Sequence, residues 1–163
     1  MAYYIIIRGP LGCGKSTIAR ELSKKLNAEH ISIDNILEKN NLLKEWEEGY
    51  ISQKSFFEAN KIAVKEAKKL LDKGKIVIFD GNFYWKSQID DLIARLNYSN
   101  HIFTLKAPLD LCIERELKRG NKLGMDAAEA VYKKSNSFTQ GTIIDATQTI
   151  SKIVKKILSY LPR

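Results

Sequence analysis

The chain has 163 residues, 44% of them hydrophobic and 28% charged, and carries a net charge of +8 at pH 7. This composition excludes a disordered or fibrous chain, and no apolar run approaches the roughly 20 residues of a membrane-spanning helix. Because it has two cysteines and a strand-like run close to its N-terminus, we expect no disulfide framework and no signal peptide, but one cytoplasmic domain over residues 1–163.

A phosphate-binding loop is the first motif along the chain. Residues 3–7 form an unbroken apolar and aromatic run, which predicts a buried strand. Residues 9–16 then match the pattern G-x-x-x-x-G-K-[ST], and Thr17 follows. Beyond the loop, Ile18, Leu22 and Leu26 recur at helical spacing. The motif therefore lies between a strand and a helix, as a phosphate-binding loop requires, and is not an isolated glycine turn.

The residue types of this loop suit a nucleoside triphosphate. Glycines let successive backbone N–H groups point at phosphate oxygens, and the helix N-terminus adds partial positive charge. Lys15 is placed to reach the β- and γ-phosphates, and the Ser16 hydroxyl is placed to hold Mg²⁺. The expected nucleotide-binding residues of the loop are Gly9, Gly12, Cys13, Gly14, Lys15, Ser16 and Thr17.

Strand-like and helical segments alternate through the rest of the chain, which favours a parallel sheet with helices on both faces. We expect further strands at 30–33, 76–79, 101–105 and 142–144. Helices are expected at 35–38, 52–72, 85–96, from Pro108, near 127–134 and at 150–161, with the rest of 35–50 irregular. In the helix from Pro108, the apolar residues Leu109, Cys112, Ile113 and Leu117 are expected to face inward.

Asp34 is the candidate general base, because it comes just past the second expected strand. In open parallel sheets, ligands bind at the carboxyl ends of the strands, so that Asp34 would face the phosphates. A carboxylate there can accept the proton of an attacking hydroxyl. The alternative is a helix N-cap, since Asn35, Ile36 and Leu37 can start a turn, and one residue can fill both roles.

Asp80 ends an apolar run at 76–79, which is the form of a Walker B segment. An aspartate in this position usually binds Mg²⁺ directly or through water, so we expect Ser16 and Asp80 to be the metal ligands. Two alternatives stay open. Asp80 can instead orient the acceptor or a neighbouring side chain, or it can be an ordinary turn residue before Gly81.

Arg115 and Arg119 lie four residues apart on one expected helix and therefore project from the same face. An arginine brought onto the γ-phosphate stabilises the charge of the transition state. The segment 119–126 is polar and contains glycine, and we expect a mobile lid over about 115–135 that expels water on closing. The alternative is a solvated basic helix end.

Aromatic residues that follow the two aspartates are candidates to line an acceptor pocket or to stack on a base: Trp46, Tyr84 and Trp85. We expect Cys13 to be a spacer within the loop. His30 and His101 are expected to be structural residues of strands, and the sequence predicts no zinc site.

On the loop, the two aspartates and the arginine pair, the whole chain resembles the small P-loop kinases. This group contains nucleoside monophosphate kinases, shikimate and gluconate kinases, and the polynucleotide kinase and zeta-toxin branch. The resemblance implies an α/β, three-layer P-loop NTPase fold with a five-stranded parallel sheet in the order 2-3-1-4-5. It also implies ATP as the phosphoryl donor and a hydroxyl as the acceptor.

The stretch 111–119 is most similar to the lid helix of the polynucleotide kinase branch, which carries an R-x-x-x-R signature. That resemblance implies that Asp34 is the general base and Asp80 its supporting acid. It also places Asp145 where such kinases contact the rim of the adenine.

The chain departs from both kinds of relative near the acceptor. Leu37 stands where polynucleotide kinases carry an arginine that holds the substrate phosphate. Ser32 stands where shikimate kinases carry a second aspartate, and the single Gly81 replaces their triple glycine. The acceptor therefore stays open between a polynucleotide 5′ end, which the basic charge and the lid signature favour, and a small metabolite or nucleotide, which Leu37 favours.

Two other classes of function are kept as alternatives. One is an ATP-regulated switch ATPase, and the other is a nucleic-acid-binding protein that uses ATP only for regulation. A GTPase would need an N-K-x-D motif, which 121–124 lacks. The sequence predicts no oligomeric state.

Overall fold

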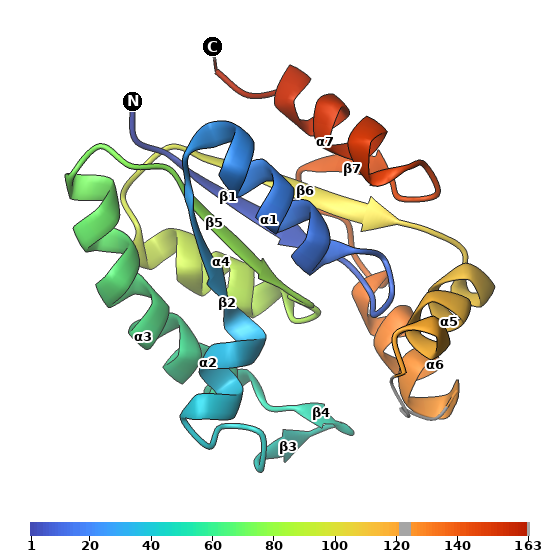
Figure 1. Ribbon diagram of the computed structural model, residues 1–163. Coiled ribbons are helices and arrows are strands. Elements are labelled where there is room, and N and C mark those ends of the chain that lie inside the picture. The colour runs from blue at the N-terminus through green and yellow to red at the C-terminus, as the bar shows by residue number, and fades with distance from the viewer. Residues whose placement is uncertain (121–124, 163) are drawn as a thin grey trace.

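A parallel sheet forms the centre of the computed structural model, which describes residues 1–120 and 125–162 (Figure 1). Its spatial order is β2-β5-β1-β6-β7. The bounds are β1 (Tyr4–Arg8), β2 (Glu29–Ser32), β5 (Val77–Gly81), β6 (Asn100–Lys106) and β7 (Thr142–Asp145). Counted along the chain these are the first to fifth sheet strands, so the expected order 2-3-1-4-5 is confirmed. Every pair is parallel, because at least one helix crosses over between consecutive strands.

Helices cover both faces of this sheet (Figure 1). On one face lie α1 (Lys15–Leu26) and α7 (Ile150–Ser159), and on the other lie α3 (Gln53–Asp72) and α4 (Lys86–Arg95). Three helices lie beyond the carboxyl ends of the strands. They are α2 (Ile33–Lys39), which follows β2, α5 (Leu109–Lys118), which follows β6, and α6 (Met125–Ser135), which comes after α5. In the part of the chain that the structure describes, no helix is both long and apolar enough to span a bilayer.

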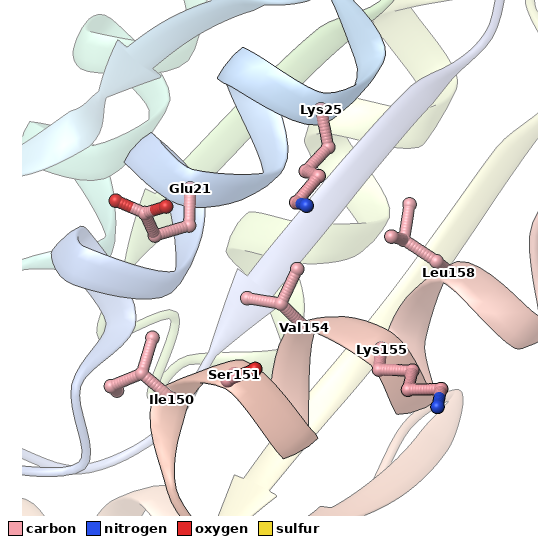
Figure 2. Close-up of a pocket in the computed structure, with 7 residues that line it drawn as sticks. All are labelled: Glu21, Lys25, Ile150, Ser151, Val154, Lys155 and Leu158. Atoms are coloured by element: carbon pink, nitrogen blue, oxygen red, sulfur yellow. The ribbon is translucent and has the colours of Figure 1, made fainter.

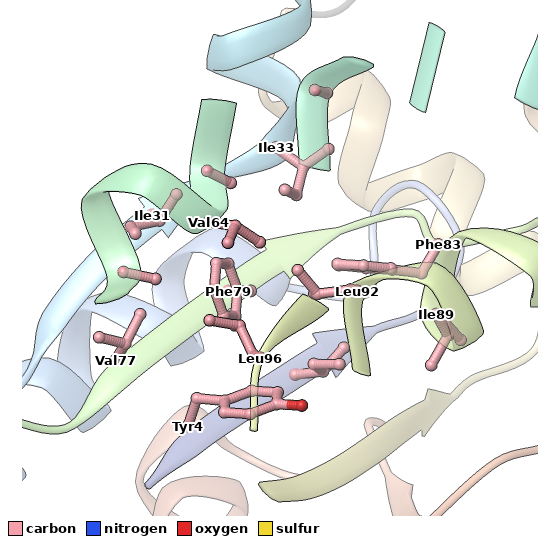
Figure 3. Packing of buried hydrophobic residues seen from close by; sticks show 14 of the residues in the cluster. Tyr4, Ile31, Ile33, Val64, Val77, Phe79, Phe83, Ile89, Leu92 and Leu96 are labelled. Atoms are coloured by element: carbon pink, nitrogen blue, oxygen red, sulfur yellow. The ribbon is translucent and has the colours of Figure 1, made fainter. Parts of the chain in front are cut away.

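The alternation of side chains along β1 divides the core into two layers. Tyr4 and Ile6 pack into the cluster under α3 and α4, where Phe79, Leu92 and Leu96 surround them (Figure 3). The intervening residues of β1 pack under α1 and α7. Because successive strand residues point to opposite faces, the apolar run predicted as a buried strand supplies both layers at once.

The region before α3 is more ordered than the sequence indicates. A short hairpin joins β3 (Trp46–Glu47) to β4 (Tyr50–Ile51). Glu48 and Gly49 both have positive φ, which is the backbone of a two-residue type I′ turn. The prediction of irregular structure there was wrong, because two-residue strands carry almost no periodicity.

The start of α2 also differs from the sequence-based expectation. The helix begins at Ile33, and the Ser32 hydroxyl accepts a hydrogen bond from the Asn35 N–H at 3.2 Å. Ser32 is therefore the N-cap, and Asp34 lies within the first helical turn. The alternative role of Asp34 as the cap was wrong.

On α5 the expected apolar face is incomplete. Cys112 is buried and Ile113 is half-buried, but Leu117 is 65% exposed. Glu116 is buried instead, with 6% exposure. Leu117 therefore lies on the outer side of α5, and its neighbour Glu116 takes the buried position.

Arg8, at the carboxyl end of β1, is fully buried. Its guanidinium donates to the carbonyl oxygens of Phe83 at 3.2 Å and Ser135 at 2.7 Å, and to the Thr104 hydroxyl at 3.1 Å. It also lies over the ring of Phe138, 4.2 Å from the centroid. Burial lowers the pKa of Arg8 to about 10. The side chain fastens the end of α6 to the central strand, and its charge lies favourably at the C-terminus of that helix.

Replacing Arg8 with methionine should lower the free energy of unfolding by about 3 kcal/mol, because two buried carbonyl groups lose their donor. Urea denaturation measures this change. Arg20→Ala is the control, since Arg20 is exposed on α1 and should change stability by less than about 0.5 kcal/mol. Equal, small losses in both variants would contradict the anchoring role of Arg8.

Candidate active site

The phosphate-binding loop is closed on one side by α5. Gly12 has φ +78°, and a Cβ built on it would lie 2.2 Å from the Cys112 carbonyl oxygen. Only a residue without a side chain fits between the loop and that helix. Gly14, with φ +90°, turns the chain into α1 directly before Lys15. The motif therefore holds its shape by contact with a segment about a hundred residues later in the sequence.

Two side chains of the loop bond to the same backbone oxygen. The Lys15 ammonium donates to the Pro10 carbonyl at 2.8 Å, and the Cys13 thiol donates to it at 2.9 Å. Cys13 is fully buried, and burial raises the pKa of its thiol, with Lys15 acting in the opposite direction. Cys13 is thus a protonated, buried group inside the loop, which agrees with the expected role of a spacer.

Asp80 lies at the carboxyl end of β5, with a side chain that is 2% exposed. Its Oδ1 accepts a long hydrogen bond from the Ser16 hydroxyl at 3.4 Å, and its Oδ2 is bonded to Nε2 of His30. The structure therefore brings together the two predicted metal ligands. It also adds His30, which the sequence analysis assigned to the strand alone.

Asp34 lies in the first turn of α2, which follows β2, the strand next to that of Asp80. The residue as a whole is exposed, but neighbouring protein atoms remove part of the hydration of its carboxyl group. This loss of hydration raises the pKa of Asp34; Lys15 opposes the rise and Asp80 adds to it. A carboxylate with a raised pKa is a stronger base, which suits proton abstraction from a hydroxyl.

The donor set of Ser16 and Asp80 fits Mg²⁺. Both atoms are oxygens, which Mg²⁺ prefers, and this ion is commonly held by one or two protein ligands together with substrate phosphates. Among the described residues no group of three or more His, Cys, Asp and Glu side chains forms a metal cage. The site therefore suits a metal that arrives with a nucleotide.

Two adjoining cavities extend from the loop. One, of about 160 Å³, is lined by residues that include Lys15, Ser16, Asp34 and Arg119. The other, of about 400 Å³, opens beside it and is lined from α5, α1 and the start of α7. The first contains the groups proposed for phosphoryl transfer, and the second is large enough for the remainder of a nucleotide.

Both predicted arginines line the larger cavity, and Arg119 reaches the smaller one as well. Arg115 donates to the Ala146 carbonyl at 2.9 Å, so its guanidinium is held at the end of β7. Arg119 is the C-cap of α5 and pairs with Glu116 at 3.6 Å. The lid expected at about 115–135 falls partly on residues 121–124, which lie outside the described residues.

Asp145 does not line the cavity that its neighbours form. Gln148, Thr149 and Ile150 line it, whereas Asp145 accepts hydrogen bonds from the Thr147 N–H at 2.9 Å and hydroxyl at 2.6 Å. These bonds lower the pKa of Asp145. In this structure Asp145 shapes the turn that carries the lining residues.

Two of the aromatic candidates, Tyr84 and Trp85, join the loop after β5 to the hairpin. Their hydroxyl and indole N–H groups bond to the hairpin backbone. The Tyr84 hydroxyl accepts from the Ile51 N–H at 3.0 Å, and the Trp85 indole donates to the Ile51 carbonyl at 2.7 Å. Burial raises the pKa of Tyr84 to about 12, with a smaller contribution from Asp34. Lys134 of α6 lies 3.5 Å from the centre of the Trp85 ring. Trp46 is 63% exposed on the hairpin.

A separate groove of about 370 Å³ runs between α1 and α7 (Figure 2). Glu21 and Lys25 line it from α1, and Val154 and Leu158 line it from α7. It carries no residue of the loop and is not part of the candidate active site.

Sequence reasoning missed Arg8 and His30. Neither belongs to a motif, and each acquires its role from segments distant in the chain. For His30 a signal was present, since it precedes Asp34 on a strand that was expected to lead into the site. Only the register between β2 and β5 shows that His30 meets Asp80.

The family model described as an AAA domain matches residues 5–134. The chain belongs to that family. The match begins in β1 and ends in α6, so it includes the phosphate-binding loop, both aspartates and both arginines of the candidate site. No curated protein matches the sequence.

Solved structures of kinases share the fold of this AAA-domain protein. A gluconokinase from Sinorhizobium meliloti superposes with a TM-score of 0.73 at 16% identity, covering 96% of this chain and 89% of that one. The APS kinase CysC of Mycobacterium tuberculosis, in complex with AMPPNP and APS, gives 0.75 at 16% identity over 97% and 96%. A shikimate kinase from Aquifex aeolicus gives 0.66 at 19% identity over 96% and 94%. The expected fold of the small P-loop kinases is confirmed.

Gly12→Ala should lower the affinity for ATP by about tenfold or more, because the added Cβ forces the loop away from α5 and the backbone N–H groups no longer converge. Titration with a fluorescent ATP analogue measures this effect. Gly74→Ala is a matched control: its φ is +81°, but nothing lies within 4 Å of the added Cβ. Equal affinities in the two variants would contradict the role of the α5 contact.

Proposed function

We propose that this protein is an ATP-dependent phosphotransferase that moves the γ-phosphate to the hydroxyl of a small molecule. The observation that carries the proposal is one cavity lined by Lys15, Ser16, Asp34 and Arg119. A phosphate-binding lysine, a base with a raised pKa and an arginine face the same space.

In the proposed reaction, the loop N–H groups and Lys15 hold the β- and γ-phosphates. Asp34 takes the proton of the acceptor hydroxyl as its oxygen bonds to the γ-phosphorus, and the bond from that phosphorus to the β–γ bridging oxygen breaks to release ADP. Arg119 stabilises the charge on the transferring group, and Arg115, on the same helix, contacts the bound nucleotide. Mg²⁺ held by Ser16 and Asp80 would neutralise phosphate charge when bound.

Two features favour a small acceptor over a polynucleotide end. Leu37 stands where the polynucleotide kinase branch carries a phosphate-holding arginine, and it is 1% exposed in the apolar core. Lysines on several helices lie beside acidic residues one turn away, as in the pairs Lys61–Glu58 and Lys86–Asp90. Such pairs offset part of the basic charge on these helix faces, so the net charge by itself does not indicate a polynucleotide partner.

The neighbouring structures add support of the same kind. The gluconokinase, the sugar kinase from Janibacter, the APS kinase and the shikimate kinase are each named for a small hydroxyl-bearing acceptor. Their low identity leaves the acceptor of this chain to be found by experiment.

Asp34→Asn should lower the rate of phosphoryl transfer by about 10²- to 10⁴-fold while ATP still binds, because the amide cannot take the proton. Single-turnover transfer and nucleotide titration measure the two effects. Asp110→Asn is the matched control, since Asp110 is also exposed in the first turn of a helix. A wild-type rate in Asp34→Asn would contradict the assigned base.

The acceptor is identified by incubating the protein with γ-labelled ATP and two sets of acceptors. One set holds sugars, sugar acids and nucleosides, and the other holds oligonucleotides with a 5′-hydroxyl or a 5′-phosphate. We expect label on a small molecule and none on either oligonucleotide. Label only on the 5′-hydroxyl oligonucleotide would overturn the small acceptor and keep the kinase. ATP hydrolysis without transfer to any acceptor would favour a switch ATPase.

A further inference from the structure

The geometry points to His30 as a positioning residue for the metal–nucleotide site: it fixes the orientation in which the Asp80 carboxylate presents an oxygen to Ser16 and to a bound Mg·nucleotide. The inference rests on the nucleotide-binding part of the proposed function, and it concerns a residue that belongs to neither the phosphate-binding loop nor the Walker B run.

The two carboxylate oxygens of Asp80 have different partners. Oδ1 of Asp80 faces the Ser16 hydroxyl at 3.4 Å, and Oδ2 is bonded to Nε2 of His30. An ionised carboxylate only accepts hydrogen bonds, so Nε2 carries the proton in this contact. A half-turn of the carboxylate would exchange two equivalent oxygens, but any intermediate rotation breaks the bond to His30.

The contact between His30 and Asp80 arises from the register of two neighbouring strands. In the parallel pairing of β2 with β5, His30 lies opposite Ile78 and Ser32 lies opposite Asp80. Successive strand residues alternate between faces, so His30, two residues before Ser32, points to the same face as Asp80. That face is covered by α1, which begins with Lys15 and Ser16.

Both side chains of this contact are largely removed from water. The side chain of Asp80 is 2% exposed and that of His30 is 21% exposed, so the imidazole ring covers one side of a carboxylate that is almost out of water. A buried carboxylate needs donors, and a donor of fixed direction also sets its rotamer. The free lone pairs of Oδ1 are thereby directed at the loop.

A group that orients a metal ligand affects the affinity for the metal more than the affinity for metal-free nucleotide. Loss of such an outer partner typically costs 10- to 100-fold in metal affinity or activity. The affinity for metal-free nucleotide depends instead on the loop N–H groups and Lys15, which His30 does not contact. His30 should therefore govern how much Mg²⁺ strengthens nucleotide binding.

The experiment measures the dissociation constant of a non-hydrolysable fluorescent ATP analogue in Mg²⁺ and in EDTA, and takes the ratio of the two. Since no acceptor is present, the outcome does not depend on kinase activity. In His30→Ala we expect the gain from Mg²⁺ to fall by about tenfold, with the constant in EDTA unchanged. His30→Gln should keep the wild-type ratio, because the glutamine Nε2 reaches the position of the imidazole Nε2.

Three further variants make the test specific. His101→Gln should leave the ratio unchanged, because His101 lies on β6, separated from β2 by the strands β5 and β1, and is edge-on to Tyr3. Asp80→Asn should lower the ratio, and adding His30→Ala to it should lower the ratio no further. If His30→Ala fails to fold, His30→Asn replaces it, since its shorter side chain does not reach Asp80.

A loss in His30→Ala that is equal in Mg²⁺ and in EDTA would overturn the inference, because it would show a structural role only. An unchanged ratio in His30→Ala, or equal ratios in His30→Gln and His30→Asn, would also overturn it and leave the proposed kinase intact. Failure of the wild-type protein to bind nucleotide under both conditions would overturn the proposed function as well.

Discussion

The burial of the Asp80 carboxylate is the constraint on which the site depends. A charge almost fully removed from water is tolerated only where hydrogen bonds and nearby cations replace its hydration. His30 and Ser16 supply those bonds from β2 and α1, so the carboxylate joins two segments that precede it by 50 and 64 residues. The same charge contributes to the raised pKa of Asp34. One buried anion thus connects the metal position, the loop and the candidate base.

The other side of the site depends on close packing instead of charge. The phosphate-binding loop lies so near α5 that a Cβ on Gly12 would overlap a backbone oxygen of that helix. Because α5 also carries Arg115 and is capped by Arg119, this contact places both arginines beside the loop, where they line one cavity with it. Arg8 plays a similar role one layer deeper, where it fastens the end of α6 to the central strand. The elements that frame the nucleotide are therefore tied to β1 and to the loop that follows it.

The side of the site where we propose that the acceptor binds is built from short elements with weak sequence signals. Tyr84 and Trp85, which follow Asp80, hold the hairpin through the backbone of Ile51, and Lys134 lies over the Trp85 ring. These contacts join the hairpin and α6 around the space beside Asp34. For the proposed phosphotransferase, these are the side chains that we expect to select the acceptor.

The sequence by itself determined the elements with strong local signals. The loop pattern, the apolar run of β1 and the helical spacing after it predicted a phosphate-binding loop between a strand and a helix. The alternation of segments predicted a parallel sheet, and the resemblance to small P-loop kinases implied its strand order. Local patterns suffice there because backbone geometry and side-chain period are properties of consecutive residues. Tertiary structure decided the rest: the pairing of His30 with Asp80 depends on strand register, Arg8 on three distant carbonyl and hydroxyl groups, and the exposed Leu117 on what α5 packs against. Contacts between segments far apart in the chain leave no periodic trace in either segment, so only the folded molecule reveals them.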